Sequence, residues 1–80
     1  MNNTMQVNLN DVCKIKAFVR ECESFDEEIA VTSDNFRVNA KSVLGVLSLD
    51  LSKPLMVYIE TSNENKLIEF CVAMKPFKEE

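Results

Sequence analysis

The chain of 80 residues contains no histidine and only one glycine, Gly45. Without imidazole, the chain lacks a common general base and a common nitrogen ligand for zinc. A single glycine also excludes a glycine-rich loop that wraps phosphate groups. Since no nucleophile stands beside a recognisable base, we expect a protein that is not an enzyme and that uses neither a metal nor a cofactor.

Charge and the distribution of apolar residues argue against a nucleic-acid-binding, a membrane-spanning or a secreted protein. The formal net charge of -4 disfavours nucleic acid as a partner, because binding to its phosphates needs clustered Lys and Arg. No apolar run approaches the length of a membrane span. The segment Met1-Asn2-Asn3-Thr4 lacks the charged and apolar regions of a signal peptide. These features predict a cytoplasmic protein without membrane insertion.

Apolar alternation predicts four strands in a single domain over residues 1–80, a length that is enough for one core. Asp34 and Asn35 supply the turn between the second and third strands. The apolar faces of the four strands are expected to be Met5, Val7 and Leu9; Ile29 and Val31; Phe36, Val38 and Ala40; and Leu55, Val57 and Ile59.

Three segments have helical spacing. Asn10 or Asp11 caps the first, and the second runs from Ser42 to about Leu49. The third ends near Pro76. The apolar faces comprise Val12, Ile15, Phe18, Val19 and Cys22 in the first helix and Leu67, Ile68, Cys71, Val72 and Met74 in the last. The order βαββαβα predicts an α+β fold, a four-stranded antiparallel sheet with helices on one face.

A resemblance to a known family adds to this pattern. The stretch Val38-Asn39-Ala40-Lys41-Ser42-Val43-Leu44-Gly45-Val46-Leu47-Ser48-Leu49 resembles the regulatory-serine helix of HPr, the phosphocarrier of the bacterial sugar phosphotransferase system. Phe18-Val19-Arg20-Glu21-Cys22-Glu23-Ser24-Phe25 and Glu28-Ile29-Ala30-Val31 are similar to the end of the family's first helix and its second strand. The resemblance covers roughly residues 5–60, is weaker over the last helix, and implies the HPr-like open-faced sandwich.

The family's phosphocarrier motif, Gly-x-His-x-Arg-Pro-Ala, is absent. Counting back from Phe18, Asp11 stands where the histidine would be, and Cys13 and Lys14 stand where the family has arginine and proline. We interpret Asp11 as a helix cap at a lost phosphocarrier position. The alternative is an aspartyl phosphate, which generally needs a metal held by further carboxylates, and the neighbouring residues supply none.

The three cysteines, Cys13, Cys22 and Cys71, show no Cys-x-x-Cys spacing. Cys22 and Cys71 continue apolar helix faces, where free cysteine behaves as a small hydrophobe. Cys13 lies at a helix start, so a redox or nucleophilic role stays open as its alternative.

Ser42 is expected to cap the second helix. The resemblance to HPr of low-GC Gram-positive bacteria implies that the dedicated HPr serine kinase phosphorylates it, which would place the phosphate near Lys41. The resemblance also implies that Val43, Leu44 and Leu47 form an exposed face that docks enzymes and regulators, leaving Val46 and Leu49 for the core. An isolated apolar stripe of this kind more often belongs to the core.

Two functional hypotheses follow. The first is a regulatory module similar to the catabolite-repression branch of the family, which lacks the histidine, keeps the serine and binds a transcriptional regulator. The second is a non-phosphorylated homodimeric scaffold, or a decoy that occupies the partners of HPr. The implied partners are therefore the serine kinase, a transcriptional regulator, components of the phosphotransferase system or a second copy of the chain.

Overall fold

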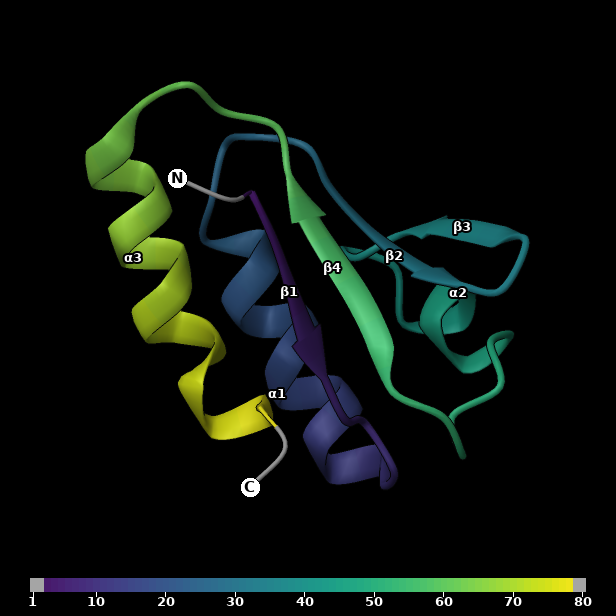
Figure 1. Ribbon diagram of the computed structural model, residues 1–80. Coiled ribbons are helices and arrows are strands. Elements are labelled where there is room, and N and C mark those ends of the chain that lie inside the picture. The colour runs from purple at the N-terminus through teal and green to yellow at the C-terminus, as the bar shows by residue number, and fades with distance from the viewer. Residues whose placement is uncertain (1–2, 79–80) are drawn as a thin grey trace.

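A computed structural model describes residues 3–78 and has the element order predicted from the sequence (Figure 1). Met1 and Asn2, on which the signal-peptide expectation partly rests, lie outside the described residues. The strands are β1 (Thr4–Val7), β2 (Ile29–Ser33), β3 (Phe36–Asn39) and β4 (Leu55–Ile59). The helices are α1 (Val12–Glu23), α2 (Val43–Leu47) and α3 (Glu64–Met74), followed by the 3-10 turn η1 (Lys75–Phe77). Within residues 3–78, no helix is long and apolar enough to cross a membrane.

The four strands form one antiparallel sheet in the order β1-β4-β2-β3. Strand β4 lies inside the sheet, where Val57 pairs with Met5 of β1 and with Val31 of β2. The predicted turn at Asp34 and Asn35 joins β2 to β3, and Asp34 has a positive φ of 52°. Aspartate tolerates this left-handed conformation better than most residues, which suits it to a tight hairpin.

Helices cover only one face of this sheet (Figure 1). The side chains of Leu55, Val57 and Ile59 point to the helices and are fully buried. On the opposite face Met56 is exposed and Tyr58 is half-buried beneath the guanidinium of Arg37, which lies 5.9 Å from the ring centroid. The alternation of buried and exposed residues confirms the predicted open-faced sandwich.

Helix α1 buries the face that the sequence predicts, with one exception. Ile15, Phe18, Val19 and Cys22 are buried, whereas Val12 is 54% exposed. Val12 is the first residue of α1, and it is not among the residues that form the core or pack against it.

The predicted apolar face of α3 is partly wrong. Its core-facing residues are Leu67, Phe70 and Met74, while Ile68 and Val72 are 51% and 65% exposed and Cys71 is half-buried. Positions three and four apart share a helix face, and Phe70 shifts the buried stripe away from Ile68 and Val72. Phe70 packs edge-to-face on Phe25, with ring centroids 5.7 Å apart.

Strand β3 also departs from the prediction. Phe36 was expected on the core face but is 68% exposed, while Val38 on the same face is half-buried and packs against the core. Because β3 is an edge strand, only the part that lies against α2 gains cover.

We expect Phe70→Ala to lower the free energy of unfolding by about 3–5 kcal/mol, because it leaves a cavity and removes the contact with Phe25. Ile68→Ala, on the exposed side of the same helix, should lower it by less than about 1 kcal/mol. Urea unfolding followed by circular dichroism measures both values. Similar losses in the two variants would contradict the assignment of the buried face.

Candidate functional site

The candidate site begins at the amino end of α1, where Asp11 is the N-cap. Its Oδ1 accepts hydrogen bonds from the backbone N–H of Cys13 at 2.7 Å and of Lys14 at 3.3 Å. Asp11, Cys13 and Lys14 are all exposed. One carboxylate oxygen therefore satisfies two helix N–H groups that have no partner within the helix.

Ser42 is the N-cap of α2 and is half-buried. Its Oγ accepts a hydrogen bond from the backbone N–H of Gly45 at 3.1 Å. A Cβ at Gly45 would lie only 3.3 Å from this Oγ and 3.4 Å from the Cβ of Val38. Glycine therefore lets the short helix approach both its own cap and strand β3, a requirement that offsets its low helix propensity.

Lys41, expected near a phosphate on Ser42, is engaged elsewhere. Its Nζ donates a hydrogen bond of 2.5 Å to the backbone oxygen of Phe25, in the connection between α1 and β2. The ammonium would have to give up this partly buried bond to reach a group on Ser42. The structure thus holds Lys41 against the end of α1.

The apolar residues of α2 divide between surface and core. Leu44 is 81% exposed and Leu47 is 41% exposed, so the side chains of these two residues are open to a partner. Val46 and Leu49 are buried, as predicted. Val43 is half-buried and packs against the core, so it contributes less free surface than Leu44 does.

Phe36 is a further exposed apolar residue, which the sequence pattern predicted to be buried. It is the first residue of β3, the strand against which α2 packs. Its alternation with Val38 and Ala40 predicted burial, so the pattern held no signal for exposure. The sequence positions proposed for partner binding therefore describe only part of the exposed apolar surface on this side.

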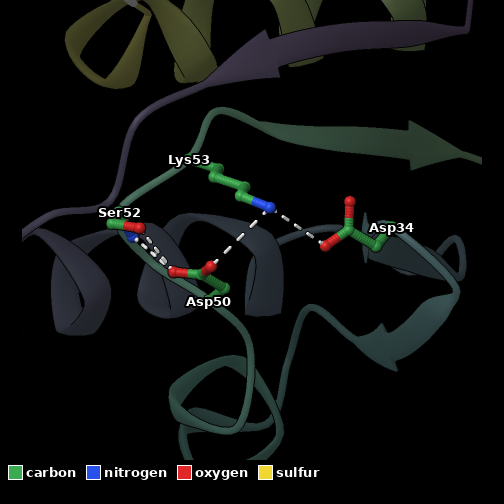
Figure 2. Close-up of polar contacts among 4 residues, drawn as sticks. All are labelled: Asp34, Asp50, Ser52 and Lys53. Carbon is green, nitrogen blue, oxygen red and sulfur yellow. Dashed lines mark hydrogen bonds and ion pairs between the residues drawn. The ribbon is translucent and has the colours of Figure 1, made fainter.

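Polar contacts hold the loop that follows α2 (Figure 2). Asp50 accepts hydrogen bonds from the hydroxyl of Ser52 at 2.6 Å and from its backbone N–H at 3.1 Å. These bonds lower the pKa of the Asp50 carboxyl, since they stabilise its charged form. Lys53 lies 3.5 Å from Asp34 in the β2–β3 turn and 4.0 Å from Asp50, all three groups being exposed. The loop is thus tied to the hairpin by contacts that are individually weak.

The structure brings Asp11 and Ser42 to the ends of two helices that pack on each other, α1 and α2. Within residues 3–78, the side chains of Asp11 and Ser42 share no hydrogen bond or ion pair, and each caps its own helix. The same residues contain no group of three or more Cys, Asp or Glu able to hold a metal ion. Burial raises the pKa of the Cys22 thiol to about 12, so this cysteine stays protonated at neutral pH.

Residues 14–70 match the family described as "PTS HPr component phosphorylation site". The matched range includes Ser42 and begins after Asp11 and Cys13, so the assignment of those two positions remains a prediction. A search of curated proteins gives no significant match.

Solved structures with a similar fold include two HPr proteins. One is HPr-C-His from Thermoanaerobacter tengcongensis, with 28% identity and a TM-score of 0.69 over 89% of this chain and 85% of that one. Another is the phosphocarrier protein HPr from Bacillus anthracis, with 28% identity and a TM-score of 0.60 over 90% and 96%. The catabolite-repression protein Crh of Bacillus subtilis shares the fold at 20% identity, with a TM-score of 0.64 over 95% and 90%.

We expect Asp11→Ala to destabilise the protein by about 1 kcal/mol, because two helix N–H groups lose their acceptor. Asp11→Asn should cost less than about 0.5 kcal/mol, since asparagine is an equally good N-cap. Chemical denaturation of the two variants and the parent measures this difference. An equal loss in both would show that the charge of Asp11, and not its capping bond, matters.

In Ser52→Ala we expect the pKa of Asp50 to rise toward its ordinary value, because the Ser52 hydroxyl is the largest cause of its lowering. Lys53→Ala should raise it less. The pKa is lower in the folded state, so the associated stability is present above the ordinary aspartate pKa and is lost as pH falls through the lowered value. Carboxyl carbon NMR titration checks both variants, and equal shifts would contradict this order of causes.

Proposed function

The chain belongs to the HPr family of the phosphotransferase system, and on this premise we propose that it is a regulatory, protein-binding module rather than a histidine phosphocarrier. The observation that carries the proposal is the surface of α2, where the family's regulatory-serine position holds Ser42 as a cap and Leu44 beside it is 81% exposed. A leucine with this exposure contributes little to the stability of the fold, but it can contribute strongly to binding at a protein interface.

Phosphate transfer through histidine is excluded by composition, because the given sequence contains none. Asp11 is a poor replacement, since its carboxylate already caps α1. An acyl phosphate on aspartate generally also relies on a metal held by further carboxylates, and residues 3–78 offer no such cluster. We therefore assign Asp11 and Cys13 to a degenerate phosphocarrier position.

Regulation acts through Ser42 in this proposal. Phosphorylation would add nearly two negative charges next to Leu44 and Leu47, at the edge of the surface that a partner covers. Such a charge changes partner choice by pairing with a partner's arginine or by disfavouring an apolar contact. The partners in this hypothesis are the HPr serine kinase, a transcriptional regulator and components of the phosphotransferase system.

A second candidate is an unphosphorylated scaffold or decoy. The observation in its favour is the same exposed Leu44, which is available to a second copy of the chain or to a partner of HPr without any modification. Crh, which shares the fold, is described as an intertwined dimer formed by domain swapping. In this case the apolar residues of α2 would matter and the hydroxyl of Ser42 would serve only the helix cap.

The test is the intact mass of the purified protein after incubation with HPr serine kinase and ATP. We expect the parent to gain one phosphate and Ser42→Ala to gain none, with a known HPr as a positive control. No gain by the parent, while the control is phosphorylated, would reject regulation at Ser42 and favour the scaffold or decoy.

The same assay tests the docking surface with a matched pair of variants. Leu47 and Met56 are both 41% exposed, the first on α2 and the second on the open face of the sheet. We expect Leu47→Asp to lower kcat/KM of the kinase about tenfold, because a charge disrupts the apolar contact. Met56→Asp should leave kcat/KM unchanged. Equal effects would place docking outside α2.

A further inference from the structure

A second exposed apolar surface lies away from α2, in a groove between the end of α1 and the outer side of α3. The groove has a volume of about 420 Å³. Its apolar floor comes from Phe25, Ile68, Val72 and Ala73. Figure 1 shows α3 and α2 beside opposite edges of the sheet, so this groove is separate from the surface of Leu44 and Leu47.

The two central apolar residues of the groove contribute little to the fold. Ile68 and Val72 are 51% and 65% exposed, and they lie four residues apart on one face of α3. Spacing of one helical turn places the two side chains next to each other. The core of this helix is formed instead by Leu67, Phe70 and Met74. Ile68 and Val72 therefore form an apolar strip that the fold itself leaves open.

The charged residues that line the groove are both acidic. Glu21 of α1 and Glu69 of α3 line the groove from its two sides. Over residues 3–78, neither carboxylate has an ion-pair partner. The Nζ of Lys66 lies over the ring of Phe25, 5.8 Å from its centroid. Two unpaired carboxylates beside an apolar floor are complementary to an apolar segment flanked by cations.

We propose that this groove binds an amphipathic helical segment of another protein, with apolar side chains against Ile68 and Val72 and lysine or arginine facing Glu21 and Glu69. This is recognition of a helix in a groove, with anchors one turn apart. A second copy of the chain fits poorly, because a two-fold contact through the same surface would bring these carboxylates against each other. The module would thus hold two partners, one at α2 and one at α3.

The probe is a synthetic peptide of about three helical turns with leucines at i and i+4 and lysines at the remaining positions. Amide NMR of the isotope-labelled full chain should show saturable shifts at the residues lining the groove. Raising the salt from about 0.05 M to about 0.5 M should weaken binding, since the rim charges are exposed. A peptide with glutamates in place of the lysines should not bind. Shifts centred on α2, or equal binding of the acidic peptide, would overturn the proposal.

Two sets of variants test the floor and the rim of the groove. Val72→Ser should weaken peptide binding at least about fivefold through the lost apolar contact, whereas Val12→Ser should not. Val12 is a suitable control because it is also an exposed valine, about 13 Å along α1 from Glu21. Combining Glu21→Lys with Glu69→Lys should reverse the preference, so that the acidic peptide binds. Unchanged binding in Val72→Ser, or an unchanged charge preference in the double variant, would overturn the proposal.

The outcome is independent of the kinase assay at α2. Leu44→Asp should leave binding of the lysine peptide unchanged, because Leu44 does not line this groove. Loss of peptide binding in Leu44→Asp together with an unaffected Val72→Ser would assign the peptide to α2 and reject the second surface.

Discussion

Strand β4 is the element on which the rest of the structure depends. It pairs with β1 on one side and with β2 on the other, although both partners are distant from it in the sequence. Its residues Leu55, Val57 and Ile59 are fully buried and belong to the same core cluster as buried residues of α1, α2 and α3. The alternation of β4 fixes which face of the sheet receives the helices and which stays open. Both proposed interaction surfaces lie on helices that pack on that face (Figure 1).

Helix capping gives Asp11 and Ser42 a structural role that needs no phosphate chemistry. Asp11 satisfies the first N–H groups of α1 through its carboxylate, and Ser42 satisfies one of α2 through its hydroxyl. A cap requires only a small acceptor at the right backbone position, whereas the family's phosphate transfer uses the imidazole of a histidine. Asp11 supplies the acceptor for α1, and the sequence contains no histidine. A chain of this family can thus keep the scaffold of a phosphocarrier while its proposed function moves to protein binding.

The two proposed surfaces differ in their chemistry. At α2, exposed leucines lie beside a serine whose modification would change the local charge. At α3, Ile68 and Val72 share a groove with the carboxylates of Glu21 and Glu69. Two different partner chemistries on one small domain make it suitable as an adaptor, since the sheet holds the surfaces apart (Figure 1). In these two proposals, regulation acts at α2, and the groove beside α3 selects its partner by charge.

The order of strands and helices, the Asp34–Asn35 turn and the caps Asp11 and Ser42 were correctly expected from local pattern, because each depends on residues close in the chain. The burial of Val46 on α2 and of Leu49 just after it was expected instead from the family resemblance, which leaves the other apolar residues of this stretch for the surface. The exposure of Phe36, Ile68 and Val72 was not foreseen, because apolar spacing predicts a face without showing whether another element covers it. Whether a side chain is buried depends on segments that are distant in the sequence. Helix α2 packs against Val38 but leaves Phe36 exposed. On α3, Phe70 is buried in the core and Ile68 is exposed to solvent. Likewise, the engagement of Lys41 with Phe25 joins two segments that no local pattern relates, and folding alone brings them together.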